Sequence, residues 1–186
     1  MKLLRRQFLA RGLASAAALT GLGSLSSFVP LGLRRAQAEA DSNAKALPEL
    51  LEASPYVYLS PLRSDGEESQ CHAEVWYAWL DGAVVMIVAK DRWKAKAIER
   101  GLVRARIWVG DHGRWKGLLS NNEDFRQAPS FAARGERVRD KQVLEQLLAR
   151  YEDKYPAEIA SWRDKMRGGY ADGSRVLLRY RPEQPL

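Results

Sequence analysis

Four cations stand at alternate positions in the stretch KDRWKAK, residues 90–96. They are Lys90, Arg92, Lys94 and Lys96, and they lie where a short helix is predicted to begin. Positive side chains there oppose the positive end of the helix dipole, whereas a bound anion would complement it. The chemistry that suits this pattern is therefore the binding of a phosphate or a carboxylate. The alternative is that these long side chains extend into solvent, and residue spacing by itself favours that alternative.

The sequence has few residues that could form other kinds of reactive centre. The chain has two histidines, His72 and His112, and a single cysteine, Cys71, so we expect no metal site. Cys71 and His72 are neighbours in an extended segment and face apart, which argues against a Cys–His dyad. No phosphate-binding loop, nucleophile elbow or paired-carboxylate motif is present. The catalytic residues stay unassigned, with the two histidines as candidates because imidazole titrates near neutral pH.

The first 38 residues have the three parts of an export signal. A basic start, MKLLRRQFLARG, precedes a mildly apolar stretch, and AQA at residues 36–38 offers a small-residue cleavage site. The run RRQFL resembles a twin-arginine signal, which is read by a receptor. We therefore predict a twin-arginine signal peptide at residues 1–38, export through the twin-arginine machinery, cleavage near Ala38 and a periplasmic location.

The alternative for this leader is an amphipathic or membrane-anchoring helix. Pro30 and several glycines disfavour a stable spanning helix, so we expect no stable membrane anchor after cleavage. The leader also carries the basic excess, because six of the 30 cations and none of the 23 acids lie in residues 1–38. The remaining 24 cations nearly balance the 23 acids, although the whole chain has a formal net charge of +7. We therefore do not expect nucleic acid as a partner.

The elements that must position the basic stretch are mostly β-strands. Alternating apolar residues bounded by turn residues predict about six strands, and apolar residues at helical spacing predict two late helices. Because consecutive antiparallel strands with one apolar face tend to close on themselves, we predict a β-barrel with added helices. The predicted strands are residues 56–60, 73–80, 83–89, 103–110, 130–140 and 174–182, and the predicted helices are residues 91–100, 140–155 and about 156–167.

Two of these strands carry strong burial signals. The strand at 73–80 alternates, with Val75 and Tyr77 on one face and Trp76 on the other. The strand at 83–89 is apolar on both faces, which predicts a central place in the sheet.

Turn and cap residues set the boundaries of the elements. Asp81 and Gly82 predict a tight hairpin turn, and Gly135 suggests a bulge in its strand. Asp91 is a suitable N-cap for the short helix, and Gly101 is a suitable stop. Residues 39–54 precede the barrel as a lead-in segment, either a short helix or a loose linker.

The run from VVMIVA through KDRWKAKAIERG into VRARIWVG resembles the core of the FMN-binding split-barrel family, the pyridoxamine 5'-phosphate oxidase-like proteins. It keeps a Lys-Ala pair at Lys94 and Ala95, the apolar Ile98 and the following strand. DGEESQCHAEVWYAWLDGAVV resembles the first hairpin of that family, and SFAARGERVRD resembles its later glycine-containing strand. The resemblance covers about residues 52–182. It implies a mainly β fold with α, a split β-barrel in a domain at residues 55–186, and a homodimer with FMN sites across its interface.

The resemblance also implies roles for particular residues. In that family the loop and helix hold the FMN phosphate, so Lys94 is expected to bind it. Arg92 stands where the family usually has Ser or Thr, and Trp93 where it often has Arg; Arg92 could still pair bidentately with a phosphate. The flavin ring is expected to face the strand that holds three further residues, Glu74, Val75 and Trp76.

Two functions are compatible with these observations. The resemblance implies an FMN-dependent oxidoreductase with a small-molecule substrate or electron donor. RYRP, residues 179–182, is at best a trace of the C-terminal signature of the true oxidase, so vitamin B6 oxidation is not supported. The alternative is a non-catalytic periplasmic module that binds haem, a deazaflavin or another planar ligand, which the departures at Arg92 and Trp93 favour.

Overall fold

The computed structural model describes residues 47–114 and 122–186. The predicted signal peptide and its cleavage site lie outside the described residues. Within the two described ranges, no helix is both long and apolar enough to cross a membrane. Residues 47–53 are helical, which confirms the helical interpretation of the end of the lead-in segment.

The order of elements after this first helix follows the prediction closely, with small shifts at the ends. The helix predicted to end near residue 167 continues to Ala171, and the strand predicted to end at residue 140 stops at Val138. The elements are β1 (Tyr56–Pro61), β2 (Ala73–Trp76), β3 (Ala78–Leu80), β4 (Ala83–Ala89), α2 (Trp93–Glu99), β5 (Arg104–Val109), η1 (Asp124–Gln127), β6 (Ser130–Val138), α3 (Lys141–Lys154), α4 (Pro156–Ala171) and β7 (Arg175–Pro182).

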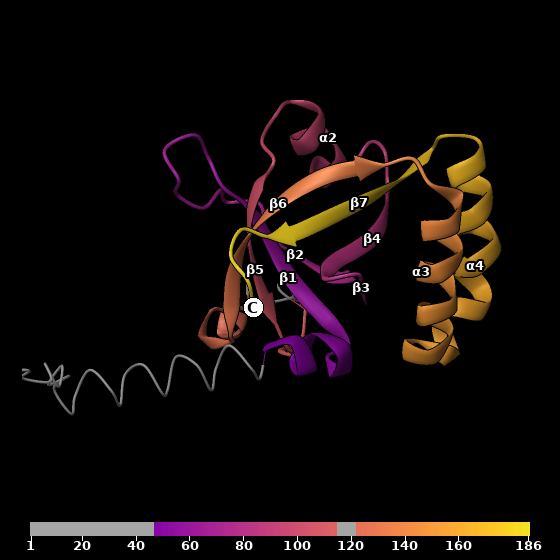
Figure 1. Cartoon of the computed structure of the whole chain (residues 1–186), viewed down its shortest axis with the longest axis horizontal. Helices are drawn as coiled ribbons and strands as arrows, with labels where there is room; N and C mark the ends of the chain where they lie inside the picture. Colours follow the sequence, from indigo (N-terminus) through magenta and orange to yellow (C-terminus); the bar gives the residue numbers. More distant parts are fainter. Residues whose placement is uncertain (1–46, 115–121) are drawn as a thin grey trace, which may run out of the picture.

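The strands form one antiparallel sheet in the order β2-β1-β5-β6-β7-β4-β3. β2 and β3 lie at opposite ends of this order, yet only Tyr77 separates them in the chain. The sheet therefore curls until its two edges meet in a nearly closed barrel (Figure 1). The prediction of a mainly β split barrel with added helices is confirmed. The strand count differs because the strand predicted at residues 73–80 is broken in two.

Two tyrosines hold the break at Tyr77: Tyr151 on α3 and Tyr155, the C-cap residue of α3. The Tyr77 N–H donates a hydrogen bond to Tyr155 Oη over 3.1 Å, and Tyr151 Oη donates to the Trp76 carbonyl over 2.8 Å. The Trp76 ring stacks on Tyr155 with 4.5 Å between centroids. An interrupted strand leaves backbone groups without ladder partners, and buried groups of that kind need other partners. The two phenols supply them.

The predicted alternation survives the break, because Val75 and Tyr77 pack inside the barrel and Trp76 packs outside it. Tyr77 also donates a hydrogen bond from its hydroxyl to the carbonyl of Leu51, 2.7 Å away, which ties the first helix to the barrel. Leu51 itself is fully buried.

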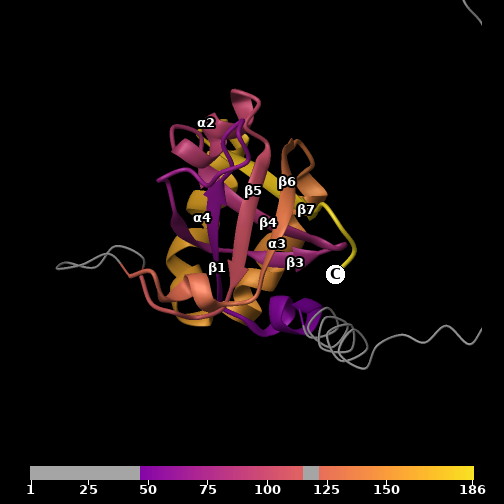
Figure 2. The same cartoon turned by 90° about the vertical axis from the view of Figure 1, so that its left-hand side faces the viewer.

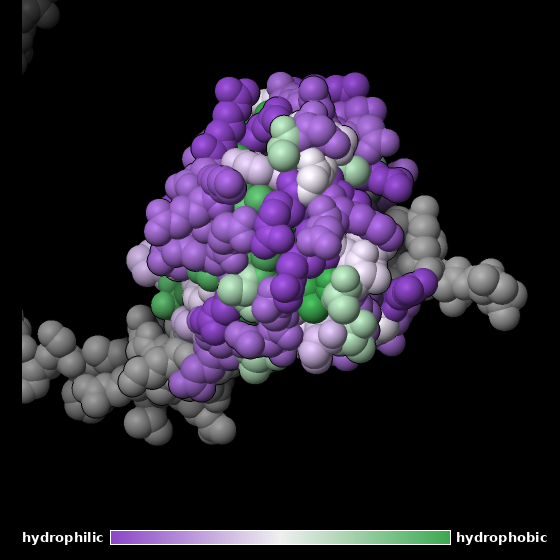
Figure 3. All heavy atoms as spheres, turned by 90° about the vertical axis from the view of Figure 1, so that its right-hand side faces the viewer, coloured by the Kyte–Doolittle hydropathy of each residue, from purple (hydrophilic) through white to green (hydrophobic). Residues whose placement is uncertain are grey.

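The two larger apolar clusters lie inside the barrel and between the barrel and the helix pair. β4 contributes to both, with Val84 and Met86 inside and Val85 and Ile87 outside, as its apolar sequence predicts. α3 and α4 lie side by side against one side of the barrel, and in Figure 2 they stand behind β1, β5 and β6. Seen from the side that the helix pair covers, the surface is mostly hydrophilic (Figure 3).

The short helix α2 spans Trp93–Glu99, within the predicted residues 91–100, and its N-cap lies one residue later than predicted. Its N-cap is Arg92 rather than Asp91, and no side chain caps its first turn. The stop at Gly101 is confirmed, because this glycine has a φ of 81° and its N–H donates to the carbonyl of Ile98. The Asp81–Gly82 hairpin turn is also confirmed, since both residues have positive φ values.

The bulge suggested at Gly135 is absent, because β6 pairs with β7 residue by residue through this position. A Cβ atom at Gly135 would lie 2.5 Å from the Tyr180 ring and 2.6 Å from the Ile98 side chain. Glycine is therefore needed there for packing between α2 and the barrel rather than for a change of register.

Replacing Tyr155 with Phe is expected to lower the free energy of unfolding by about 1–3 kcal/mol, because the buried Tyr77 N–H loses its acceptor. Tyr170→Phe is the matched control, since the Tyr170 hydroxyl makes no hydrogen bond to the described part of the chain; a change within about 0.5 kcal/mol is expected. Urea unfolding measures both. Equal stability of the two variants would show that the Tyr155 hydroxyl does not hold the break.

Candidate functional site

The barrel is split where β2 and β4 separate. β3 pairs with β4 only as far as Val85; beyond that point β4 pairs with β7 alone, and β2 pairs with β1 alone. A pocket of about 500 Å³ opens there. All six residues predicted as binding residues line it, although a role in binding stays a prediction. The lining residues are Glu74, Val75, Trp76, Ile87, Val88, Ala89, Arg92, Trp93, Lys94, Tyr151, Trp162, Met166 and Arg175.

Tyr151 closes the split beneath this pocket. Its hydroxyl donates to the Trp76 carbonyl on β2, and a backbone hydrogen bond from Ile87 on β4 reaches the same oxygen. The phenol thus bridges the two strands where they no longer pair with each other. Burial raises the pKa of Tyr151 well above its usual value, and the Ile87 hydrogen bond opposes this shift only in part. Tyr151 is therefore a neutral structural bridge at neutral pH.

Lys94 is the cation of the pocket whose pKa is lowered by its surroundings. It lies in the first turn of α2, is partly buried, and its Nζ lies 4.7 Å from the centroid of the Trp93 ring. Burial, and secondly the nearby Arg92, lower the pKa of Lys94 to about 8. No carboxylate of residues 47–114 or 122–186 pairs with this ammonium group. An anion bound beside Lys94 would oppose both causes of the shift.

The rest of the pocket is also cationic. Arg92 is exposed at the N-cap of α2 and Arg175 lies at the start of β7, and neither forms an ion pair with the described residues. Glu74 is the single carboxylate among the lining residues. Three cations against one acid give the pocket an excess of positive charge, which favours an anionic ligand.

The side chains of the three predicted site residues on β2 point in different directions. Val75 points into the barrel and is 8% exposed, whereas Trp76 is held against Tyr155. The Glu74 carboxylate lies 3.4 Å from Tyr58 Oη on the neighbouring strand β1. Burial raises the pKa of Glu74. Glu74 is thus a partly buried acid at the edge of the pocket.

Neither histidine lines this pocket. His72 is buried, with its Nε2 3.0 Å from Arg126 Nη2, and burial followed by Arg126 lowers its pKa. The ring of His112 lies 5.9 Å from that of Tyr58. Both belong to the outer side of the sheet, near an aromatic cluster of Tyr58, Trp108 and Phe125. Among the described residues, no group of three His, Cys, Asp or Glu side chains is placed to hold a metal ion.

Seven lining residues were not among the predicted site residues: Ile87, Val88, Ala89, Tyr151, Trp162, Met166 and Arg175. The first three lie on β4, and Tyr151, Trp162 and Met166 face the barrel from the helix pair; their sequence patterns do not predict the pocket. Trp162 is 40% exposed, and the guanidinium carbon of Arg175 lies 5.5 Å from its ring centroid. Arg175 reaches the pocket only because β7 pairs with β4, which no local pattern reveals.

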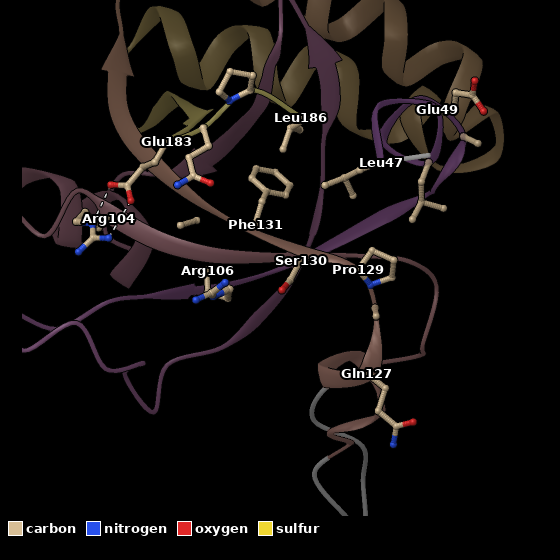
Figure 4. A pocket seen from close by; sticks show the side chains of 16 residues that line it. Leu47, Glu49, Arg104, Arg106, Gln127, Pro129, Ser130, Phe131, Glu183 and Leu186 are labelled. Atoms are coloured by element: carbon tan, nitrogen blue, oxygen red, sulfur yellow. Dashed lines mark hydrogen bonds and ion pairs between the residues drawn. The ribbon is translucent and has the colours of Figure 1, made fainter. Parts of the chain in front are cut away.

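A larger pocket, of about 1060 Å³, lies between the first helix, β5, β6 and the C-terminal residues (Figure 4). None of the six predicted residues lines it. Its Arg104 is neutralised by a bidentate ion pair with Glu183, with both N–O distances at 2.8 Å. The size of a pocket does not by itself identify a ligand site. We therefore take the pocket at the split, where Lys94 is desolvated and has no carboxylate partner among the described residues, as the candidate site.

The fold is shared with several solved structures. HutZ, the haem storage protein from Vibrio cholerae, aligns with a TM-score of 0.51 and 16% identity over 75% of this chain and 89% of its own. A conserved hypothetical protein from Mycobacterium tuberculosis aligns with a TM-score of 0.50 and 16% identity over 75% and 80% of the two chains. A putative pyridoxamine 5'-phosphate oxidase from Listeria innocua aligns with a TM-score of 0.49 and 13% identity over 76% and 94%.

At these identities the likeness shows the fold alone. No protein-family model and no curated protein sequence matches the chain.

Replacing Lys94 with Met is expected to stabilise the cofactor-free protein by about 1–3 kcal/mol at pH 7, because the variant no longer has a buried unpaired charge. The folded state lowers the pKa of Lys94 from 10.5 to about 8, so the charge is costly below pH 8 and the difference should vanish as pH rises from 8 to 10.5. Lys96→Met, on the exposed face of α2, is the control and should gain nothing. Chemical unfolding at several pH values tests this, and a loss of stability in Lys94→Met at pH 7 would contradict it.

Proposed function

We propose that this chain binds FMN in the pocket at the split and is a flavin-dependent oxidoreductase that acts on a small-molecule substrate or electron donor. The observation that carries the proposal is Lys94, a partly buried cation that contacts the Trp93 ring but has no carboxylate partner among the described residues, at the edge of a pocket with aromatic walls. Bound flavin supplies the electron transfer, while the protein binds, orients and excludes water.

The residues of the pocket fit this group. Lys94 and Arg92 would hold the phosphate, since a phosphate dianion neutralises adjacent cations and Arg can pair with it through two N–H groups. Trp76 and Trp93 offer apolar faces to a planar ring system. Glu74, with its raised pKa, is placed to exchange a proton or to accept a hydrogen bond at the edge of the site.

We also propose that the protein is exported by the twin-arginine machinery, loses residues 1–38 and acts in the periplasm as a homodimer. The support for export is the leader sequence, and the support for a dimer is the resemblance to the split-barrel family, in which both subunits build each FMN site. Nucleic acid remains excluded from the proposed partners, because the chain after the leader is nearly neutral.

The second candidate is a binding module for haem or a deazaflavin. One structure of similar fold is a haem storage protein, which favours the haem alternative. However, haem iron is most often held by His, Cys, Met or Tyr, and neither histidine lines the pocket. Met166 lines it but is buried, with 6% of its surface exposed, and the Tyr151 hydroxyl is already bonded to Trp76 and Ile87. The pocket therefore fits a phosphorylated flavin better than an iron-ligated ring.

The test is a titration of the purified, cofactor-free full chain with FMN, with haem and a deazaflavin in parallel, followed by absorption and fluorescence. We expect FMN to bind most tightly. Its Kd should rise about 10–100-fold in Lys94→Met and stay within about twofold in the control Lys96→Met. In the wild type, FMN should bind about tenfold more weakly at pH 9 than at pH 7, because deprotonation of Lys94 removes the charge.

Tight haem binding with a Soret band and no FMN binding would favour the second candidate. FMN binding that ignores both the Lys94 substitution and pH would remove the proposed phosphate site.

A further inference from the structure

Arg175 lines two pockets at once. One is the pocket at the split, and the other is a smaller pocket of about 250 Å³ beside it. This second pocket lies where β6 ends, β7 begins and α4 approaches its C-terminus. It has no acidic lining residue; its walls are Arg137, Val138, Arg139, Tyr170, Arg175 and Val176.

The Arg175 side chain is held in place by its neighbours. A Cβ atom at Gly169 would lie 2.8 Å from both Cγ and Cδ of Arg175, so the glycine lets the arginine stem lie against α4. Its guanidinium then lies over the Trp162 ring, 5.5 Å from the centroid. No carboxylate in the described ranges forms an ion pair with it. The guanidinium is therefore ordered by apolar contacts, and its N–H groups stay available for a ligand.

The other two cations of the second pocket, Arg137 and Arg139, differ in their ion pairing. Arg139 is exposed and has no ion-pair partner within the described residues. Arg137 pairs with Glu99 only at 3.7 Å. Asp140, the neighbour of Arg139 in the sequence, is the N-cap of α3, where its side chain accepts a hydrogen bond from the Gln142 N–H. Of the three guanidinium groups, only that of Arg137 has a carboxylate partner among the described residues.

A phosphate on Lys94 and Arg92 would leave Arg175 and Arg139 without a counter-charge. We propose that Arg175 and Arg139 form a separate oxyanion subsite, so that the small molecule meeting the bound flavin carries a phosphate or carboxylate group. The subsite would hold that group while the rest of the substrate reaches the pocket at the split past Arg175. The statement that the substrate meets a bound flavin rests on the proposed function. The position of the subsite does not depend on it.

Pyrophosphate is a suitable probe for the subsite, and isothermal titration calorimetry on the FMN-saturated full chain measures its binding. We expect one pyrophosphate per chain. Arg139→Ala should weaken it at least about tenfold, because a charge-assisted pair is lost. Arg134→Ala is the matched control: this arginine is exposed on β6 and lines neither pocket, so the Kd should stay within about twofold.

Arg175→Lys keeps the charge and the aliphatic stem but loses the planar guanidinium. We expect the affinity for pyrophosphate to fall less than in Arg139→Ala. Circular dichroism confirms that each variant is folded. If pyrophosphate binding responds equally to Arg139→Ala and Arg134→Ala, or does not occur, the subsite is refuted.

The same titration without FMN separates this inference from the proposed function. Should FMN fail to bind while pyrophosphate binding still depends on Arg139 and Arg175, the flavin proposal falls and the subsite stands. Should pyrophosphate binding depend on Lys94 alone, the second subsite is wrong, and the outcome for FMN decides the proposed function independently.

Discussion

The interruption of one strand at Tyr77 is the constraint on which the rest of the structure depends. Residues 73–80 must pair with β1 at one end and with β4 at the other, and no straight strand can do both. The bend leaves backbone groups without ladder partners, and the Tyr155 and Tyr151 hydroxyls bond to two of them. α3 is therefore part of the barrel closure as well as a cover for it. The same bend forces β2 and β4 apart, and the candidate site lies in the gap.

The charges of this gap differ from those elsewhere on the surface. Several arginines of the described chain form ion pairs, as Arg104 does with Glu183. Lys94 and Arg175 instead lie beside aromatic rings and have no carboxylate partner among the described residues. A desolvated cation costs stability, and proteins commonly accept such a cost where function requires it. Aromatic faces keep the cations ordered without neutralising them. The site is thus arranged to receive negative charge from outside the chain.

Local sequence patterns predicted much of this, for physical reasons that can be named. Side-chain alternation gave the correct faces of β2 and β3, because period-2 geometry continues through the bend. The break itself was missed, since it depends on a hydrogen bond between Tyr77 and Tyr155, 78 residues apart. Lys94 was found from a motif, whereas Arg175 enters only through the pairing of β7 with β4. The bulge expected at Gly135 was wrong because packing against Ile98, rather than register, requires the glycine.

The most direct test of the central claim, that Lys94 is kept charged and unpaired for an anionic ligand, is the pKa of its ammonium group followed by NMR of isotope-labelled protein. The account predicts a value of about 8 in the cofactor-free chain and a clear rise when FMN is added. An ordinary lysine pKa that does not respond to FMN would contradict it.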